Sequence, residues 1–395
     1  MLSVAEAAAA VLARVPRLGT EQVALDAAVG RILAEDIVAK RALPGFDNSA
    51  MDGYAVRSAE LPATLPIAGS VAAGQVWTDP VPERAAIRIM TGAPMPAGLD
   101  TVVIQEDVTL DGDSVTLPEA PVGDNVRYAG EDIAIDEVAI PAGTRLGGWD
   151  IGVLAALGVS TVPVAKAPRV ALIATGDELV DLATEPSYGQ LVDSSAHALE
   201  ALVRDVGGIP HRVGIARDDM SALGDLIASA LGYDVVITTG GVSVGDRDHV
   251  RAALANAGVT LELWKVAMRP GKPFSFGLHD GRPVFGLPGN PVSTVVGFEL
   301  FLRPALLAMQ GARAVERPRA MVQLVRGYRK GAGRTHYIRA TVSRNGEHLI
   351  AHPHAKQGSA MLSSLVGCNA LVELAADEVE YAPGALVPAI LLEAV

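Results

Sequence analysis

The sequence predicts a multidomain α/β protein whose main sheet is mostly parallel and is covered by helices on both faces. Three observations lead to this fold class. The chain has 395 residues, which is more than one hydrophobic core normally serves. From Pro168 onward, continuous apolar runs alternate with helical stretches, as in a buried parallel sheet. Between residues 41 and 165, and again after Pro318, short apolar runs alternate with turn residues, which favours strands.

The N-terminal region is predicted to begin with helices and to continue as a β-rich segment. Residues 3–15 and 20–36 have helical patterns, and Thr20 is the candidate N-cap of the second helix. Gly, Pro and Asp separate the short apolar runs from residue 41 onward, with a helix returning near 148–158. The last 80 or so residues are long enough for a small barrel or sandwich.

Three apolar runs in the α/β segment each end in a loop rich in glycine or polar residues. The runs RVALIAT, DVVITT and VFGL lead into the loops TGDE, TGGVSVG and LPGNP. Helices are predicted to follow these loops, at 193–206, 247–257 and 292–309. Ligands of open α/β sheets bind outside the carboxyl ends of the strands. The three loops are therefore expected to meet at one edge and to carry the functional groups.

Composition limits the partners and the location of the protein. A formal net charge of −13 disfavours nucleic acid and anionic membranes, because neither is attracted to an acidic protein. The single cysteine, Cys368, excludes an intrachain disulfide and a multi-cysteine metal site. The N-terminus lacks a basic region and is interrupted by Glu6. No uninterrupted apolar run reaches the roughly 18 residues of a membrane span, and we expect a cytoplasmic protein.

The glycine-rich loop after the second strand indicates an anion and a metal ion. Gly240 and Gly241 allow the backbone to approach a ligand and turn its N–H groups toward an anion. The loop is neither a Walker loop nor a dinucleotide fingerprint. Asp246 and Asp248 follow it and suggest a hard cation, Mg²⁺, bridging phosphate oxygens. The alternative is a tight turn with a capping aspartate.

Cations gather in the segment 265–273, KVAMRPGKP. Lys265, Arg269 and Lys272 surround a Pro-Gly turn in an otherwise acidic chain. An anion clamp would use Arg for forked contacts and Lys as a point charge. The alternative is a solvated basic loop.

Several further carboxylates lie in loops where a capping or turn role is the alternative. Helix capping is the alternative for the pairs Asp177–Glu178 and Asp218–Asp219. Asx-rich turns are the alternative for the segments 47–54, 90–98 and 125–132, which contain Asp52, Thr91, Arg127, Glu131 and Asp132. His352 and His354 are interpreted as a strand end with outward imidazoles. The combination of carboxylates, an anion loop and cations at strand ends indicates metal-assisted chemistry on a phosphate-bearing ligand.

Eight motifs in order resemble the MoeA and gephyrin E-domain family, between about residues 41 and 310. They are DNSAMDGYAVR at 47–57, RIMTGAPMP at 88–96, NVRYAGEDI at 125–133, TGDEL at 175–179, GQLVDS at 189–194, TGGVSVGDRD at 239–248, MRPGKPF at 268–274 and GLPGNPVS at 286–293. The C-terminal part matches more weakly, through RTHYIRA at 334–340 and QGSAMLSS at 357–364. In two departures, Arg269 stands where many members have Lys, and His249 where Tyr is common.

The resemblance implies four domains and an elongated homodimer. Residues 1–44 and 133–167 would form a discontinuous first domain, with residues 45–132 inserted into it as a β-rich second domain. Residues 168–312 would form the three-layer α/β/α molybdopterin-binding domain with its parallel-rich sheet. Residues 313–395 would form a small β-barrel.

The resemblance also implies a reaction and a shared site. Family members insert molybdate into adenylylated molybdopterin with release of AMP and use a divalent cation. The site is thought to lie between the α/β domain of one subunit and the inserted domain of its partner. Carried over by motif, the inserted domain would contribute Asp52, Thr91, Arg127 and Asp132, the α/β domain Glu178, Asp219, Asp248, Lys265 and Arg269, and the barrel Ser359. The adenylyltransferase that supplies the substrate and apo-molybdoenzymes are further candidate partners.

At residue level, we expect the glycine loop and its neighbours to hold the pterin-side phosphate. Substrate-binding candidates there are Gly240, Gly241, Ser243, Lys272 and Pro288. Asp246 or Asp248 would hold Mg²⁺, Lys265 and Arg269 would offset molybdate and phosphate charge, and Glu178 or Asp219 would position water. Two other functions stay open at this point, a molybdopterin adenylyltransferase and a non-catalytic scaffold like gephyrin.

Overall fold

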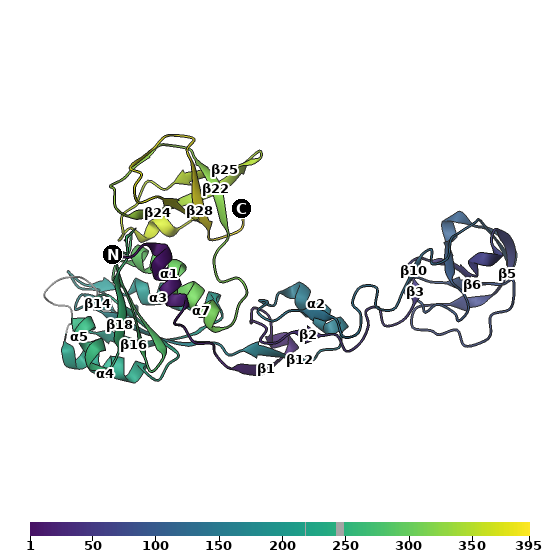
Figure 1. The fold of residues 1–395 in the computed structure, drawn as a ribbon, viewed down its shortest axis with the longest axis horizontal. Helices are drawn as coiled ribbons and strands as arrows, with labels where there is room; N and C mark the ends of the chain where they lie inside the picture. Colours follow the sequence, from purple (N-terminus) through teal and green to yellow (C-terminus); the bar gives the residue numbers. More distant parts are fainter. Residues whose placement is uncertain (218, 242–248) are drawn as a thin grey trace.

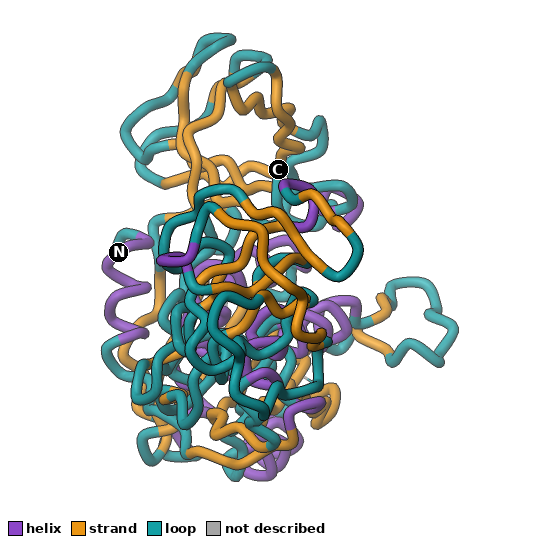
Figure 2. The backbone as a smooth tube through the Cα atoms, turned by 90° about the vertical axis from the view of Figure 1, so that its right-hand side faces the viewer, coloured by secondary structure: helices purple, strands orange, loops and turns teal. Residues whose placement is uncertain are grey.

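The computed structural model describes residues 1–217, 219–241 and 249–395, and its shape is elongated (Figure 1). A large α/β sheet and a β-barrel stacked on it form one end of the molecule. A small middle part around helix α2 (Gly148–Ala156) follows, and a separate β-sheet lies at the opposite end. Figure 2 looks along the long axis with that separate sheet in front.

The α/β part is built on a six-stranded sheet in the order β16-β13-β17-β21-β20-β18. Its first four strands are parallel, β20 is antiparallel to β21, and the edge strand β18 is antiparallel to β20. The strands are β13 (Arg169–Thr175), β16 (Ile209–Ala216), β17 (Val235–Thr239), β18 (Thr260–Lys265), β20 (Pro273–His279) and β21 (Arg282–Leu287). The sequence patterns had predicted β13, β17 and the end of β21, but not the other three strands.

Helices cover both faces of this sheet, because successive residues of a strand point to opposite sides. Val170 and Leu172 of β13 belong to the core under α1, α3 and the 291–309 helix, and Ala171 and Ile173 to the core under α4 and α5. The helices are α1 (Val4–Leu12), α3 (Ser194–Asp205), α4 (Met220–Ala230), α5 (His249–Asn256), and α6 (Pro291–Gly297), which continues through the π-helical turn η4 (Phe298–Leu302) into α7 (Arg303–Met309). The predicted three-layer α/β/α arrangement is therefore confirmed, although α4 was not anticipated.

The predicted helix over residues 20–36 is wrong. Residues Thr20–Ala24 form strand β1, paired antiparallel with β12 (Thr161–Ala165), and only Leu25–Ala27 make a single 3₁₀ turn. The pairing partner lies about 140 residues away in the sequence, so local periodicity carries no sign of it. The first helix does form, shorter than predicted, with Ser3 and Glu6 as its capping box.

The middle and far parts are joined by two chain segments. β1 pairs with β12, and β2 (Ile37–Val38) pairs with β11 (Val138–Ile140), so the chain leaves and re-enters the middle part side by side. Between these segments lies a six-stranded sheet in the order β7-β4-β6-β5-β9-β8. Its strands are β4 (Gly53–Val56), β5 (Ala63–Val71), β6 (Ala86–Ile89), β7 (Thr101–Ile104), β8 (Thr109–Asp111) and β9 (Ser114–Leu117). This arrangement supports the domain boundaries at 44/45 and 132/133, which remain our proposal.

The C-terminal part is a closed barrel of five strands. β24 pairs with β25, β25 with β22, β22 with β28, β28 with β26, and β26 again with β24, which closes the ring. The strands are β22 (Arg319–Leu324), β24 (Thr335–Asn345), β25 (His348–Pro353), β26 (Ala370–Leu374) and β28 (Leu386–Leu391). The small barrel is confirmed, and its closure leaves no open edge among these strands. Strand β19 (Met268–Arg269) of the α/β part adds to β24.

The 291–309 helix is the only described helix long and apolar enough to cross a membrane, and it is a core helix with 89% of its apolar window buried. It contains one buried carboxylate, Glu299, whose side chain is 4% exposed. Arg317 donates from Nε and Nη2 to the two carboxylate oxygens, at 3.0 and 3.2 Å. Arg303 lies farther away, with 4.0 Å between Nε and the carboxylate.

We expect Arg317→Met to lower the free energy of unfolding by about 3 kcal/mol, because it removes the main partner of a buried carboxylate. The exposed Arg313, which forms no ion pair among the described residues, is the matched control. Thermal and urea unfolding of both variants measure the difference. Equal midpoints for Arg317→Met and Arg313→Met would show that Glu299 does not depend on this partner.

Candidate active site

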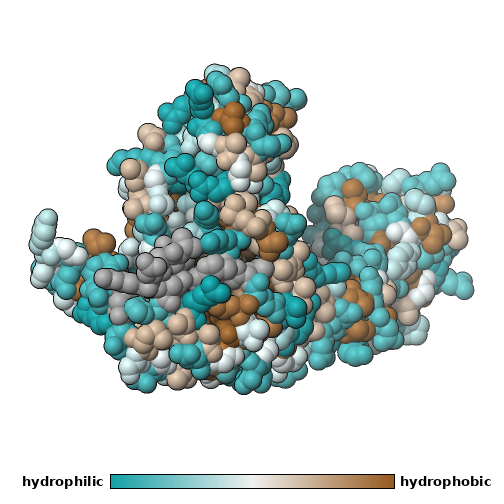
Figure 3. Space-filling view, turned by 60° about the vertical axis from the view of Figure 1, so that its left-hand side comes forward, coloured by the Kyte–Doolittle hydropathy of each residue, from teal (hydrophilic) through white to brown (hydrophobic). Residues whose placement is uncertain are grey.

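A cleft in the α/β part opens at the carboxyl ends of β13, β17 and β21, where the sequence predicted that the three loops would meet. It has a volume of about 670 Å³. The loops after the three strands form one side, the start of α3 another, and the barrel loop with Ala360 and Leu362 the third. Figure 3 shows this end of the molecule with a mainly hydrophilic surface, on which hydrophobic residues occur in small separate groups.

Backbone hydrogen bonds fix the floor of the cleft. The Gly240 N–H donates to the Leu287 carbonyl at 3.0 Å, and the Thr175 hydroxyl donates to the Thr239 carbonyl at 3.0 Å. These bonds join the ends of β13, β17 and β21. The ends of the three central strands are consequently held at fixed relative positions before any ligand binds.

Gly240 and Gly241 both line the cleft and both have a left-handed backbone, with φ of +85° and +62°. A side chain at Gly240 would run into the Thr175 carbonyl. Glycine is therefore required here by the backbone conformation and by close approach. The turn leads directly toward residues 242–248, so the predicted residues Ser243, Asp246 and Asp248 lie outside the described part of the chain, as does Asp218.

Of the predicted carboxylates, Glu178 lines the cleft and Asp219 does not. The Glu178 carbonyl accepts from the Leu191 N–H at 2.8 Å, which joins β14 (Leu179–Val180) to β15 (Leu191–Val192). Asp219 is the N-cap of α4 and accepts from the Ala222 N–H at 2.8 Å. Asp219 therefore acts as a helix cap in this structure, which was the alternative considered for the 218–219 pair. Within the described ranges no three His, Cys, Asp or Glu side chains are grouped as metal ligands.

The predicted cation cluster is spread along one turn and does not line the cleft. Lys265 and Lys272 are exposed and neighbour one another across the turn, because the Val266 N–H donates to the Lys272 carbonyl at 3.1 Å. Arg269, in β19, instead lines a separate cavity of about 160 Å³ against the barrel. Sequence spacing alone had grouped three side chains that the fold directs to two places.

The predicted residues of the inserted part lie in or near β4, β6 and β10, and Figure 1 places this part at the opposite end of the molecule from the α/β sheet. Asp52 accepts from the N–H and the hydroxyl of Thr91, at 2.7 and 2.9 Å. These two hydrogen bonds, of which the one from the Thr91 backbone has the larger effect, hold the pKa of the Asp52 carboxyl below its usual value. Arg127 is exposed in β10 (Val126–Arg127), and Asp132 is exposed nearby in sequence. A single subunit therefore does not bring these residues to its own cleft.

The barrel contributes one predicted residue and several that were missed. The Ser359 carbonyl accepts from the Val292 N–H at 3.1 Å, which fastens the barrel loop to α6 beside Pro288. Sequence reasoning did not select Asp193 and Ser195 at the start of α3, which line the cleft, or Lys330, His336 and Arg339 of the barrel, which line the cavity with Arg269. Arg339 could have been selected from the sequence, because it is an arginine in the otherwise apolar end of the run RTHYIRA.

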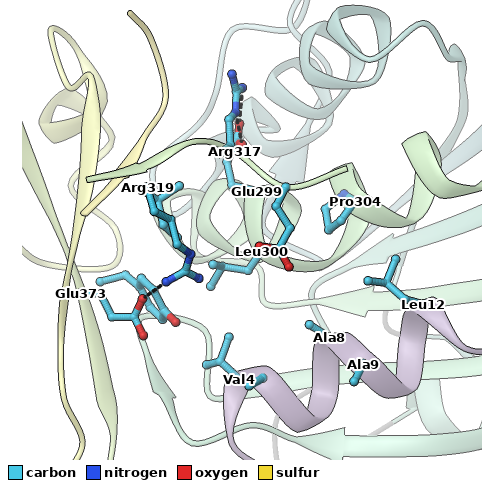
Figure 4. Close-up of a pocket in the computed structure, with 14 residues that line it drawn as sticks. Val4, Ala8, Ala9, Leu12, Glu299, Leu300, Pro304, Arg317, Arg319 and Glu373 are labelled. Atoms are coloured by element: carbon cyan, nitrogen blue, oxygen red, sulfur yellow. Dashed lines mark hydrogen bonds and ion pairs between the residues drawn. The ribbon is translucent and has the colours of Figure 1, made fainter. Parts of the chain in front are cut away.

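A groove between α1 and the barrel contains none of the predicted site residues (Figure 4). Val4, Ala8 and Leu12 of α1 face it, and the Arg317–Glu299 and Arg319–Glu373 pairs cross it. The second pair has 2.7 Å between Arg319 Nη1 and Glu373 Oε2. The first pair joins the 291–309 helix to the segment that leads into the barrel, and the second joins the barrel strands β22 and β26.

Comparison with known proteins agrees with this architecture over nearly the whole chain. Residues 2–158 match the MoeA N-terminal region (domain I and II), residues 171–308 a probable molybdopterin binding domain, and residues 321–392 the MoeA C-terminal region (domain IV). A molybdopterin molybdenumtransferase of Haemophilus influenzae is 35% identical over 382 residues, which covers 95% of this chain and 94% of that protein. The chain belongs to the MoeA family of molybdopterin molybdenumtransferases.

Other members of the family agree in sequence and in structure. A molybdopterin molybdenumtransferase of Nostoc sp. is 40% identical over 327 residues, covering 79% of this chain and 75% of the relative. The crystal structure of the molybdopterin biosynthesis moeA protein from Pyrococcus horikoshii OT3 is 33% identical, with a TM-score of 0.87 and coverage of 99% and 100% of the two chains. The chain is therefore an enzyme of molybdenum cofactor biosynthesis, as the sequence motifs implied.

We expect Gly240→Ala to lower the free energy of unfolding by about 1–3 kcal/mol, the usual cost of a strained left-handed residue. Gly224→Ala, on α4, is the matched control because an added Cβ there meets no atom within 4 Å, and Ala gains about 1 kcal/mol of helix propensity. Thermal unfolding distinguishes the two. A Gly240→Ala variant as stable as Gly224→Ala would contradict the requirement for glycine at this turn.

Proposed function

We propose that the enzyme inserts molybdate into adenylylated molybdopterin, with Mg²⁺-dependent release of AMP. The observation that carries the proposal is the 670 Å³ cleft at the strand ends, where a left-handed glycine turn and Glu178 lie together. This volume is within the range of about 300–1,000 Å³ typical of small-molecule sites. In the reaction, water cleaves the phosphoanhydride of the ligand, which yields AMP and the pterin-side phosphate.

The phosphate end of the ligand is assigned to the floor of the cleft. Gly240 and Gly241 permit close backbone approach, and α3 and the 291–309 helix both begin at the cleft wall. Amide N–H groups at helix starts and in glycine turns bind anions. We assign the pterin-side phosphate to this floor, with Ser243, Pro288 and Ser359 as neighbouring contacts.

Glu178 and Asp219 are the candidates for positioning the attacking water. Glu178 is the better placed, because it lines the cleft while Asp219 caps α4. The donor set also fits Mg²⁺, which needs only one or two carboxylates besides phosphate oxygens. Asp246 and Asp248, which follow the glycine turn in the sequence, are the residues that would hold the ion. When bound, the ion would neutralise charge between these carboxylates and the phosphates.

Two separate groups of cations support the handling of anionic substrates. Lys265 and Lys272 are exposed on the turn after β18, and Arg269 lines the neighbouring cavity. We assign Lys265 and Arg269 to offsetting the charge of molybdate and phosphate, the role expected of preorganised cations.

A homodimer is the assembly that unites the candidate residues. The candidates Asp52, Thr91, Arg127 and Asp132 belong to the inserted part, which lies at the opposite end of the molecule from the α/β sheet (Figure 1). A two-fold pairing places the same two surfaces of each subunit against one another. We propose that the inserted part of each subunit completes the cleft of its partner.

The two other functions that the sequence left open are less well supported. An adenylyltransferase reaction would need only the α/β part, yet residues 2–158 and 321–392 match the MoeA terminal regions. A scaffold would not need the glycine turn and Glu178 in one cleft. Incubation with molybdopterin and ATP separates the first alternative, because a molybdenumtransferase should not form the adenylate.

The direct test combines the purified enzyme, adenylylated molybdopterin, molybdate and varied Mg²⁺. We expect AMP release to require Mg²⁺ and to activate an apo-molybdoenzyme. Asp248→Asn keeps the side-chain shape and removes one charge, so it should raise the Mg²⁺ concentration needed. Asp111→Asn, at the exposed last residue of strand β8, should behave as wild type. Full activity in excess EDTA, or identical Mg²⁺ curves for the two variants, would contradict the metal role.

Co-expression of two inactive variants tests the shared site. Asp52→Asn changes the inserted part and Glu178→Gln changes the cleft, so a mixed dimer would keep one intact site of its two. Random pairing should then restore about a quarter of wild-type activity for a two-fold dimer. The matched control combines Glu178→Gln with Lys265→Ala, which both alter the α/β part and should restore nothing. Restoration in neither mixture, with mixed dimers present, would place the whole site within one subunit.

A further inference from the structure

Asp193 is a buried carboxylate in the wall of the active-site cleft, and it has no role in the proposed reaction. Only 7% of the residue is exposed. It lines the 670 Å³ cleft at the point where β15 leads into α3. Burying a carboxylate is costly unless its oxygens have partners. The partners of Asp193 therefore indicate what this part of the cleft binds.

One of the two carboxylate oxygens is used within the protein. Oδ1 caps α3 by accepting from the Ala196 N–H at 3.0 Å. The backbone N–H of Asp193 donates to the Val180 carbonyl at 3.0 Å, which fixes the residue relative to β14. In the described part of the chain, Oδ2 has no hydrogen-bond or ion-pair partner. The carboxylate is thus held in place with one acceptor oxygen unused.

The surroundings supply neither a cation nor a metal group for this oxygen. Among the described residues that line the cleft, none is a lysine or an arginine. On its other side, Asp193 borders a cavity of about 230 Å³ in which Arg212 is paired with Glu200, with 3.1 Å between Nε and Oε2. No three described His, Cys, Asp or Glu side chains are grouped as metal ligands. An N–H group of a bound ligand is the partner that remains.

Apolar side chains flank Asp193 in the cleft. Leu179, Leu191 and Val192 come from β14 and β15, and Leu362 comes from the barrel loop. Leu191 is 62% exposed, so a ligand in the cleft has apolar surface to cover. An apolar surface with one acceptor at its edge fits the face and the N–H edge of a flat heteroaromatic ring.

This end of the cleft is joined to the floor that we assign to the pterin-side phosphate. The Ser195 hydroxyl donates to the Gly289 carbonyl at 3.4 Å. Gly289 in turn lies against the glycine turn, since a Cβ added to it would be 3.5 Å from the Gly240 Cα. A ring at Asp193 and a phosphate at the glycine turn would therefore share one continuous cleft.

We propose that Asp193 recognises the pterin ring of the substrate by accepting hydrogen bonds from its 2-amino group and the neighbouring ring N–H. Carboxylates accept from the amino groups of nucleobases in the same way. The assignment rests on the proposed function, in which the ligand also carries an adenine with an amino group. The pterin edge presents two adjacent donors, whereas the adenine amino group lies between two ring acceptors that a carboxylate repels. Asp193 is then a specificity residue, because a site built to bond an N–H rejects analogues that lack it.

The test compares two rings that differ at the recognised edge. 6-Hydroxymethylpterin has an amino group at C2, and 6-hydroxymethyllumazine has an oxo group there. Binding of each to the full-length protein is measured by isothermal titration calorimetry in buffer with EDTA, so that no metal bridges the carboxylate and the ring. We expect the wild type to prefer the pterin about tenfold to a hundredfold, the effect of one hydrogen bond to a charged group.

Three variants assign this preference to Asp193. Asp193→Asn should reverse it, because asparagine caps a helix as well as aspartate does but presents an N–H donor where Oδ2 accepts. Asp193→Ser also preserves a capping hydroxyl but lacks the second oxygen, so it should weaken pterin binding without a reversal. Asp36→Asn is the matched control, since Asp36 Oδ1 also accepts from one backbone N–H, that of Ala142 at 2.7 Å, in the middle part. It should leave the preference unchanged.

A second pair of ligands distinguishes the pterin from the adenine. AMP and IMP differ by the same exchange of an amino for an oxo group. A reversal by Asp193→Asn with AMP and IMP, but not with the pterin pair, would overturn the pterin assignment in favour of adenine. Equal behaviour of Asp193→Asn and Asp36→Asn with all four ligands would overturn ring recognition and leave Asp193 as a helix cap. Failure of the wild type to bind either pterin ring would overturn it as well.

The binding experiment and the enzyme assay can fail separately. The titrations involve no molybdate and no turnover, so they measure recognition of the ring alone. Absence of AMP release in the enzyme assay would refute the proposed reaction, whereas loss of the pterin preference in the titrations would refute only the role of Asp193.

Discussion

Parallel pairing of β13, β17 and β21 is the constraint on which the rest of the structure depends. This pairing brings the loops after the three strands to one edge of the sheet. Hydrogen bonds from the Gly240 N–H to the Leu287 carbonyl and from the Thr175 hydroxyl to the Thr239 carbonyl join them there. Helix α3 and the 291–309 helix begin at this same edge of the sheet. A cleft with amide groups and a carboxylate follows from this pairing without any special local geometry beyond the left-handed glycines.

The sequence predicted those features whose signal is local. Continuous apolar strands, the helices at 193–206 and 292–309, and the strand-end loops all appear where their patterns indicated. The helix predicted over 20–36 failed because β1 is determined by a partner strand near residue 163. The edge strand β18 and its neighbour β20 were missed for a related reason, since their antiparallel pairing depends on a hairpin-like turn within a cation-rich segment.

The candidate site shows the same limit at the level of side chains. Motif spacing selected Lys265, Arg269 and Lys272 as one cluster, but backbone direction separates Arg269 from the two lysines. Lys330 lies in none of the quoted motifs, and His336 lies in RTHYIRA without being selected there. Packing alone places both beside Arg269. Which cations share a cavity is a property of packing, and packing between the barrel and β19 cannot be read from either segment alone.

The discontinuous middle part has a consequence for how the chain folds as it is made. Strand β1 must wait for β12, and α1 must wait for the 291–309 helix on which it packs. The N-terminal 40 residues are therefore without their partners while the inserted sheet is synthesised. Prior folding of that insert draws residues 38 and 138 together, since β2 and β11 pair there, and so shortens the loop that β1 and β12 must close. Prior folding of the insert thus favours assembly from the far end of the molecule inward, and β1 and α1 can pack only after residues 161–165 and 291–309 are present.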